Sequence, residues 1–400
     1  MSIKSASSEQ RVWTIFLVFL RLGFTSFGGP IAHLGYFRQE FVQRRAWLSD
    51  QDYGDLVALC QFLPGPASSQ VGLSIGLIKG GYSGALAAWA GFTLPSALIL
   101  VLFALGVAGG GELLSAGVLN GLKVVVVAVV AQALWGMGTS LCPDRLRVCL
   151  MLLSCAVVLL VPGLSSMLII LAFSGLIGAW LLPVKVANGG ELGHFTVISK
   201  RWGLLFLGVF FGLLFALPIL SEVLASDTIG LIDAFYRTGS LVFGGGHVVL
   251  PLLEAEPLVT QMVNRDVFLA GYGIAQAVPG PLFTFSAYLG ASSELASSSW
   301  FGASVALLSI FLPSFLLIFA VFPFWLDIRT NRLARAALMG LNASVVGVLL
   351  AAFYDPVWVT AINSREAFLA SLLAFAALTI FKLPAWLVVL LGASLGHFAL

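Results

Sequence analysis

Long runs of apolar residues follow one another along almost the whole 400-residue chain, and this feature constrains the fold more than any other. A membrane-spanning helix needs about 20 mostly apolar residues. Only 10% of the residues are charged, against about 25% in a soluble globular protein, so the chain could not cover itself with a polar surface. We therefore expect an all-α integral membrane protein that has lipid as its main solvent.

Thirteen runs are candidate spans, so we expect about 13 transmembrane helices. The second and the ninth contain Pro-Gly-Pro and could be broken or re-entrant. The runs are 12–31, 53–79, 83–106, 113–138, 146–161, 164–183, 202–220, 229–250, 267–290, 300–326, 333–353, 366–381 and 384–400.

The Lys and Arg residues predict the orientation, because cytoplasmic connections carry an excess of both. If all thirteen runs cross, thirteen basic residues, among them Arg265, lie on the side of the N-terminus. Four lie on the other side, namely Arg38, Arg44, Arg45 and Arg365. This distribution predicts a cytoplasmic N-terminus and, with an odd number of crossings, a C-terminus outside.

The sequence repeats itself at an offset of about 216 residues. The repeat predicts two homologous domains of about six helices, 1–183 and 229–400, and a linker, 184–228, with one unpaired helix at about 202–220. Six plus one is odd, so the second half would enter the membrane from the opposite side, as in the inverted repeats of secondary transporters. A duplicated membrane domain without a transport role is the alternative. The matches include Arg21 with Arg237, Gln61 with Gln276, Ser96 with Ser314, Gly121 with Gly340 and Gly178 with Gly396.

Two arginines interrupt apolar runs at matching positions of the repeat. Arg21 lies in the first run and Arg237 in the eighth. A charge inside a bilayer is costly and is therefore a functional candidate, and the planar fork of a guanidinium suits an oxyanion. Each arginine could instead reach the interface or pair with a carboxylate, such as Asp233 four residues before Arg237.

Both arginines precede a glycine motif, and each half then contains a Pro-Gly-Pro break. A helix that restarts after a break presents free N–H groups and a positive dipole end to an anion, and hydroxyl residues follow each break. Broken helices in matching positions point to a transporter's binding site, although packing kinks would give the same pattern. The candidate substrate site comprises Arg21, Arg237, Gly28, Gly29, Gly244, Gly245, Pro64, Gly65, Pro66, Pro279, Gly280, Pro281, Ser68, Ser69 and Thr284.

Further polar residues are candidates for proton movement or gating. Lys123 lies deep in the fourth run, where its repeat mate is Asn342; a buried lysine can release a proton, or it could pair with Asp55 or Asp233. Polar packing and a solvated loop are the alternatives for the others, which are His33, His247, Asp55, Arg38 and Glu40.

Other classes of protein lack support in the sequence. There is no GxxxxGK[ST] loop for a nucleotide, no spacing typical of a metal site and no basic patch for nucleic acid, so we expect no cofactor and an ion gradient or the membrane potential as the energy source. Ser74 and Ser394 each lie in a GxSxG pattern. An intramembrane hydrolase would need a histidine and an acid near one of them.

Two signatures give the chain a family resemblance. The stretch from Phe27 through His33 to Leu63-Pro64-Gly65-Pro66 resembles the N-terminal signature of the chromate transporter (CHR) family. Gly244-Gly245-Gly246-His247, continued to Leu253 and followed by Pro279-Gly280-Pro281, resembles the C-terminal one. The resemblance covers nearly the whole chain, in the family's long, two-domain form, a fusion of antiparallel homologous halves.

The resemblance implies a non-enzymatic secondary transporter in the bacterial inner membrane. It would export chromate from the cytoplasm and give chromate resistance, driven by the membrane potential, a proton gradient or both, with sulfate as the competing isostere. Membrane lipid is an expected partner, and a homo-oligomer stays open. An importer or exchanger of sulfate or another tetrahedral oxyanion, and a passive anion channel, are the alternatives.

Overall fold

The computed structural model describes residues 8–108, 116–183, 198–243, 248–293, 296–325 and 331–399, and within these ranges every regular element is a helix. The first half contains α1 (Ser8–Thr25), α2 (Gly29–Phe37), the π-helix η1 (Arg38–Arg44), α3 (Asp50–Phe62), α4 (Ala67–Ala108), α5 (Ala116–Leu141), α6 (Arg145–Leu160) and α7 (Leu164–Leu181). The linker helix is α8 (Lys200–Leu224).

The second half repeats this order with shorter pieces. It contains α9 (Asp227–Leu241), α10 (Val249–Glu254), α11 (Pro257–Met262), α12 (Arg265–Ala277), η4 (Leu282–Thr284), α13 (Phe285–Ser292), α14 (Ser299–Val321), η5 (Phe322–Phe324), α16 (Arg332–Ala352), η6 (Phe353–Trp358), α17 (Val359–Ala361), α18 (Arg365–Thr379) and α19 (Ala385–Ala399).

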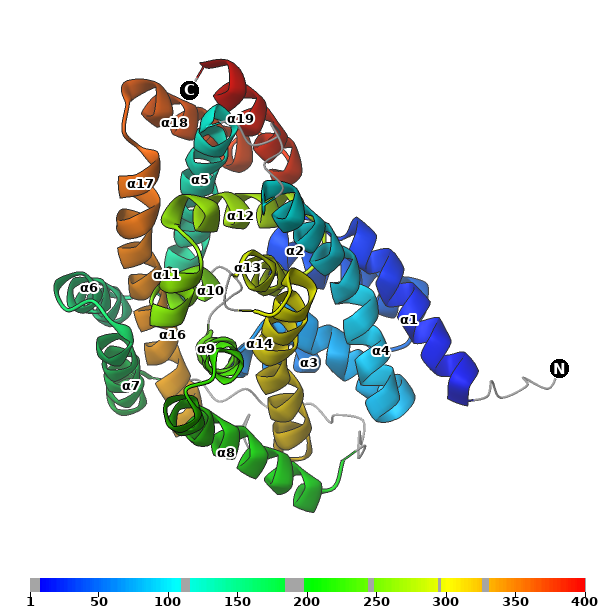
Figure 1. Ribbon diagram of the computed structural model, residues 1–400. Coiled ribbons are helices and arrows are strands. Elements are labelled where there is room, and N and C mark those ends of the chain that lie inside the picture. The colour runs from blue at the N-terminus through cyan, green and yellow to red at the C-terminus, as the bar shows by residue number, and fades with distance from the viewer. Residues whose placement is uncertain are drawn as a thin grey trace.

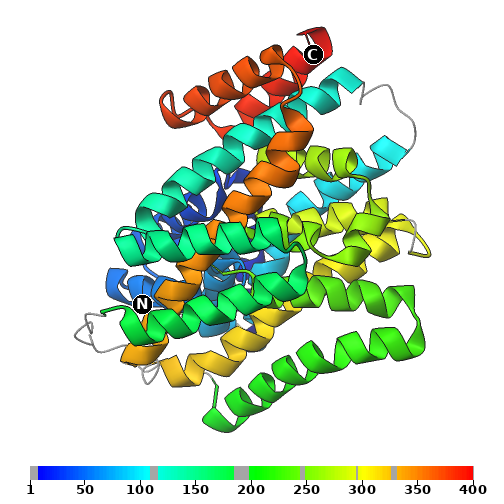
Figure 2. The ribbon, with the colours of Figure 1, turned by 90° about the vertical axis from the view of Figure 1, so that its left-hand side faces the viewer.

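The two halves are interlocked by a reciprocal exchange of helices. Helix α5 of the first half packs against α18 and α19 of the second, and α16 of the second packs against α6 and α7 of the first. Figure 1 shows α18 and α19 at the top of the view and α6 and α7 at its left edge, and Figure 2 shows α5 and α16 running between the two groups. Helix α8 packs mainly on α9 and α14 of the second half.

Glycine makes this exchange possible. A Cβ on Gly121 of α5 would collide with the carbonyl oxygen of Gly392, and a Cβ on Gly340 of α16 would collide with that of Ser174. In lipid, helices associate mainly through close packing, so small residues at the crossing let the backbones touch. The repeat mates Gly121 and Gly340 thus have equivalent structural roles.

We expected each of the runs 12–31 and 229–250 to form a single helix, but neither does. Helix α1 ends at Thr25, and Gly28 and Gly29 adopt positive φ angles of 95° and 78°, which glycine reaches without steric cost. The chain then turns back along α1, because the rings of Phe37 and Phe41 lie 5.6 and 5.0 Å from that of Phe19. Helix α9 likewise ends at Leu241.

The Pro-Gly-Pro segments break their helices as the sequence suggested. Leu63 and Val278 are extended, and Gly65 and Gly280 have φ angles of 122° and 108°. Helix α4 starts directly after the first break and reverses direction at Gly80 and Gly81, where the backbone leaves helical geometry, so that Gly76 packs against Gly84 and Ala88. The first half therefore presents two helical hairpins whose tips are the glycine-containing breaks, and the described part of the second half presents one, at Pro279-Gly280-Pro281.

Five helices in the described ranges are long and apolar enough to cross a membrane. Four of them form two pairs of repeat mates, α4 with α14 and α5 with α16, and the fifth is the linker helix α8. The other runs form shorter helices, several of them in hairpins. The chain is thus an all-helical, multi-pass membrane protein with five clear spans, against the 13 that we expected.

One ion pair is hard to reconcile with thirteen crossings. Arg265 contacts Asp355 at 3.0 Å, although the thirteen-span scheme placed Arg265 on the N-terminal side and the connection that contains Asp355 and Arg365 on the other. Under that scheme the two residues would lie on opposite faces of the membrane, whereas the ion pair places them side by side. The count of 13 crossings is therefore not confirmed.

We expect Gly340→Ala to destabilise the fold and Gly138→Ala to leave it intact. Both residues lie within long helices, where Gly→Ala normally gains up to about 1 kcal/mol. At Gly340 the new Cβ meets a backbone oxygen, whereas at Gly138 it meets no atom within 4 Å, and such overpacking costs about 1–3 kcal/mol. Thermal unfolding of the purified protein would show this as a lower midpoint for Gly340→Ala only. Equal midpoints for the two variants would contradict the glycine-dependent exchange.

Candidate functional site

The two Pro-Gly-Pro breaks are each completed by a backbone hydrogen bond to the segment that follows α1 or α9. The N–H of Gly65 donates to the carbonyl oxygen of Val242 at 2.7 Å, and the N–H of Gly280 donates to that of Ser26 at 2.9 Å. Ser26 and Val242 are repeat mates that follow α1 and α9. Each Pro-Gly-Pro loop therefore docks on the helix end of the other half, as expected for a pseudo-two-fold arrangement.

Gly65 and Gly280 are required there by both conformation and space. A Cβ on Gly65 would lie 2.6 Å from Ser314 Oγ, and one on Gly280 would lie 2.7 Å from Ser96 Oγ. Ser96 and Ser314 are also repeat mates, on α4 and α14. The loop of each half thus contacts a serine side chain of the other half, and the two serines occupy equivalent positions of the repeat.

Several polar side chains around the breaks are buried without a hydrogen-bond partner among the residues that the structure describes. Leaving a buried hydroxyl unpaired costs about 1–3 kcal/mol, so such a group points to a bound ligand or water. Others are satisfied locally, since Thr284 donates to Pro281 O at 2.7 Å and Ser96 to Thr93 O at 3.0 Å. The unpaired oxygens belong to Ser26, Ser69, Thr93, Ser286, Ser314 and the Gln70 amide.

His33 joins this region from α2. Its Nδ1 lies 3.3 Å from Ser68 Oγ, and its ring meets that of Phe92 edge-on at 5.3 Å. The side chain is buried, and its Nε2 has no hydrogen-bond partner within the described part of the chain. The site thus holds an imidazole nitrogen as well as hydroxyl groups.

The two intramembrane arginines have different surroundings. Arg237 binds Glu256 through Nε and Nη2 at 3.0 and 2.9 Å, and Nη2 also contacts Asp233 at 3.0 Å. Arg21 makes no ion pair with any described residue and lies on an exposed face of α1 between Leu17 and Phe24. Arg237 therefore pairs with carboxylates, as the alternative interpretation of the sequence allowed, and Asp233 is one of its two partners.

Lys123 also has a partner, though neither of the two we considered. Its Nζ lies 3.1 Å from Asp266 Oδ1, which ties α5 to the start of α12. Sequence reasoning missed both Glu256 and Asp266. A signal for both was present, because they lie 216 residues after Glu40 and Asp50, at the offset of the first block of the repeat.

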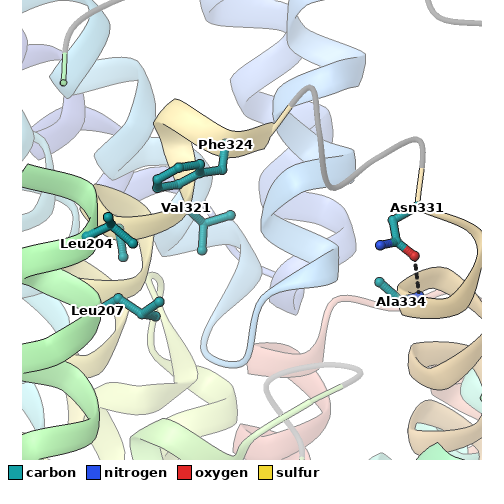
Figure 3. Close-up of a pocket in the computed structure, with 7 residues that line it drawn as sticks. Leu204, Leu207, Val321, Phe324, Asn331 and Ala334 are labelled. Atoms are coloured by element: carbon teal, nitrogen blue, oxygen red, sulfur yellow. Dashed lines mark hydrogen bonds between the residues drawn. The ribbon is translucent and has the colours of Figure 1, made fainter. Parts of the chain in front are cut away.

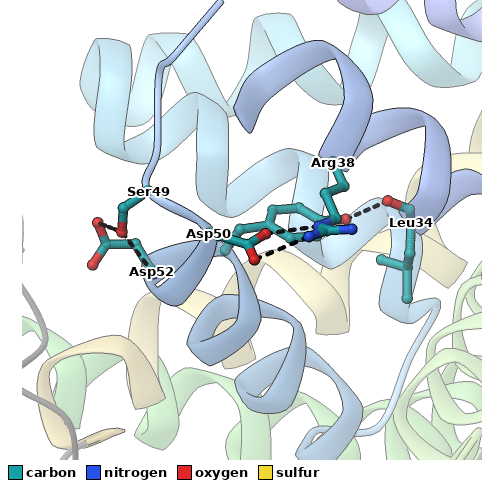
Figure 4. A network of polar contacts seen from close by, with 6 residues as sticks. Leu34, Arg38, Ser49, Asp50 and Asp52 are labelled. Carbon is teal, nitrogen blue, oxygen red and sulfur yellow. Dashed lines mark hydrogen bonds and ion pairs between the residues drawn. The ribbon is translucent and has the colours of Figure 1, made fainter. Parts of the chain in front are cut away.

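Arg38 and Glu40 lie in a polar network of η1 and the start of α3, at the ends of these helices far from the breaks. Arg38 binds both carboxylate oxygens of Asp50, at 2.7 and 3.0 Å, as Figure 4 shows. The hydrogen bond from Arg38 and its charge hold the pKa of Asp50 below its ordinary value. Glu40 accepts from Arg45 at 2.6 Å. The Arg38 pair is exposed, so it contributes little to stability, and it lies at a hairpin base, not at the breaks.

The remaining candidates are placed only in part. Gly244, Gly245 and His247 lie outside the described residues, and Asp55 is half-buried on α3. Ser74 and Ser394, the two GxSxG serines, lie within α4 and α19, Ser74 beside Cys60 Sγ and Ser394 bonded to Leu390 O. A helix interior lacks the sharp strand-to-helix turn that exposes such a nucleophile.

An all-helical membrane protein with repeated helix breaks around buried polar groups has the architecture of a transport protein. The comparison with known families agrees: the sequence model of the family described as "Chromate transporter" matches residues 13–179 and 229–397. The chain belongs to this family. The two matched segments coincide with the two halves of the repeat, and the family membership indicates a non-enzymatic transport protein.

Full-length relatives carry matching names. The chain is 28% identical to the chromate transport protein of Cupriavidus metallidurans over 84% of this chain and 80% of that protein. It is 26% identical to the chromate transport protein of Pseudomonas aeruginosa, over 87% and 81%. An uncharacterized transporter of Methanocaldococcus jannaschii is 25% identical over 84% and 82%. No solved structure matches the chain.

We expect Gly65→Ala to reduce transport at least ten-fold, because it forces a Cβ into an unfavourable φ region and against Ser314 at the meeting point of the breaks. Uptake of the labelled substrate into vesicles would measure it. Gly163→Ala is the matched control, since Gly163 has a φ of 138° but no atom within 4 Å of its Cβ position. Similar losses in both variants would show that backbone strain alone, and not the break site, is responsible.

Proposed function

We propose that this protein is a secondary transporter that exports chromate from the bacterial cytoplasm across the inner membrane and so gives resistance to chromate. The observation that carries the proposal is the reciprocal docking of the two Pro-Gly-Pro loops, which gathers unpaired donors at one place in a chain of the chromate transporter family. The relatives named as chromate transport proteins support the substrate.

The donors suit a tetrahedral oxyanion. Ser69 lies in the first turn of α4, directly after one break, and Ser286 follows the other. Hydroxyl groups and the N–H groups at a restarting helix donate to anionic oxygens, and the positive end of the helix dipole favours the charge. Ser26 and Ser314 add donors from α1 and α14. An anion bound between the breaks would contact both halves at once, as alternating access requires.

The arginines then have separate roles. Arg237 is bound by two carboxylates, so this cluster as a whole is not cationic and holds the hairpin after α9 in place. Arg21 keeps its positive charge unpaired within the described residues, and we assign to it the attraction of the oxyanion. Asp233 and Glu256 are also the acids that could carry a proton beside a transported anion.

The membrane potential favours export. Moving one charge through 100 mV is worth about 2.3 kcal/mol, so two charges leaving a cell at about −150 mV gain on the order of 7 kcal/mol. This equals a gradient of about 10⁵-fold. Electrogenic export of the chromate dianion would therefore suffice for detoxification, whereas import of the dianion would need at least three protons to be electrically favourable.

The topology we propose is an inverted repeat with five full crossings. Two crossings in the first half plus α8 make three, so the second half starts from the opposite side. The first-half hairpins then return Arg38, Arg44 and Arg45 to the side of the N-terminus, while Arg265 moves to the other. This increases the excess of basic residues on the N-terminal side and supports a cytoplasmic N-terminus.

The second candidate is transport of sulfate or another tetrahedral oxyanion, in either direction. Hydroxyl and backbone donors favour it equally, because they recognise charge and shape and no feature unique to chromium.

Inverted membrane vesicles that contain the protein should accumulate labelled chromate when a potential equivalent to a negative cytoplasm is imposed. Accumulation should saturate as the chromate concentration rises. The degree to which excess sulfate inhibits accumulation measures the selectivity of the transporter for chromate. Vesicles from cells with the empty vector provide the background. Signal no greater than this background, with the protein present in the membrane, would overturn export of chromate; linear, non-saturating flux would favour a channel.

We expect Arg21→Gln to abolish this accumulation without loss of membrane insertion, and Arg21→Lys to reduce it about ten-fold or more because lysine lacks the fork. Arg11→Gln, on the exposed face of the same helix, is the charge-matched control and should transport normally. Full transport by Arg21→Gln would exclude Arg21 from anion attraction and leave the hydroxyl groups as the substrate ligands.

A further inference from the structure

An apolar pocket of about 360 Å³ lies between α8, the end of α14 and the start of α16, outside the candidate substrate site. Gly203 lets α8 approach α14 closely, since a Cβ there would come within 2.8 Å of the Ala320 carbonyl oxygen. Figure 3 shows leucines of α8 facing Val321 and Phe324 across the pocket. The lining residues are Leu204, Leu207, Ala320, Val321, Phe324 and Asn331, with Ala334.

Basic residues lie in the chain next to the residues that line this pocket. Lys200 Nζ lies 5.5 Å from the centre of the Phe324 ring, which lines the pocket, and Arg201 follows it in the first turn of α8. Arg332 and Arg335 start α16 next to the lining residues Asn331 and Ala334. Neither first turn contains an acidic residue, and both helices direct their positive dipole ends here.

Helix α8 is also the most lipid-accessible of the long helices. Only 17% of its most apolar 18-residue stretch is buried inside the protein, whereas 56–67% of the corresponding stretch is buried in each of the other four long apolar helices. Trp202 is 57% exposed next to the basic pair, as is typical of an aromatic side chain at the headgroup level of a bilayer. These features are typical of a position where acyl chains meet headgroups.

We propose that this pocket binds an anionic phospholipid, with one acyl chain in the apolar pocket and the phosphate held by Lys200, Arg201, Arg332 and Arg335. Charge complementarity selects the headgroup, because four cations attract a net negative lipid and repel the choline of a zwitterionic one. The bound lipid would bridge the linker helix α8 and α16, which belong to different segments of the chain. This proposal does not depend on the substrate or on the direction of transport.

The test is native mass spectrometry of the purified, delipidated full chain, titrated with phosphatidylglycerol or phosphatidylcholine that carries the same acyl chains. The wild type should bind phosphatidylglycerol about ten-fold more tightly than phosphatidylcholine. Lys200→Gln combined with Arg332→Gln should lose this preference, whereas Lys200→Arg with Arg332→Lys should keep it, which separates lost charge from misfolding. Arg145→Gln with Arg365→Gln, at the starts of α6 and α18, is the matched control and should keep it too.

Two further arms make the result decisive. Ala334→Phe fills the pocket but leaves every cation, so it should weaken phosphatidylglycerol binding, while free inorganic phosphate should not displace the lipid. Equal binding of the two lipids by the wild type, or an unchanged preference in the Lys200→Gln and Arg332→Gln protein, would overturn the proposal. Displacement by inorganic phosphate with no effect of Ala334→Phe would show a plain phosphate site.

Discussion

A helix that breaks inside a membrane frees backbone groups that water cannot satisfy, and the chain must supply partners for them. This protein solves the problem across its two halves. The N–H of Gly65 in the first half is accepted by Val242 of the second, and that of Gly280 in the second by Ser26 of the first. The break in each half is therefore stable only when the other half is in place, and the small residues and hydroxyl groups of the site are assembled by this requirement.

The halves differ mainly in charge. Arg38 binds Asp50 in the first half, whereas its repeat mate Glu254 binds Arg265, the residue before the mate of Asp50, so the order of the charges is reversed. The second-half hairpin is also tied to the crossing helices through Lys123–Asp266 and Arg265–Asp355. Helix α8 covers α9 and α14, whereas the corresponding face of α1 exposes Leu17 and Phe24. A symmetric backbone thus carries asymmetric electrostatics and an asymmetric surface.

The sequence predicted the class of fold and the location of the breaks well, because hydropathy and Gly/Pro punctuation report directly on helices in lipid. It predicted the equivalence of Gly121 and Gly340 through the repeat. It could not show that α1 ends at Thr25, since an apolar run looks the same whether the helix crosses or turns back. It also missed Asp266 as the partner of Lys123, because a contact between residues 143 positions apart depends on the exchange of helices.

The same exchange sets an order for assembly during synthesis. Gly121 of α5 packs against Gly392 of α19, which the ribosome makes about 270 residues later, or about 14–54 seconds at 5–20 residues per second. During this interval the glycine face of α5 has no native neighbour and must be covered by lipid or by the insertion machinery. The final hairpin of α18 and α19 therefore acts as the closing step of the fold, and the loss of the last few residues would affect the first half of the chain as much as the second.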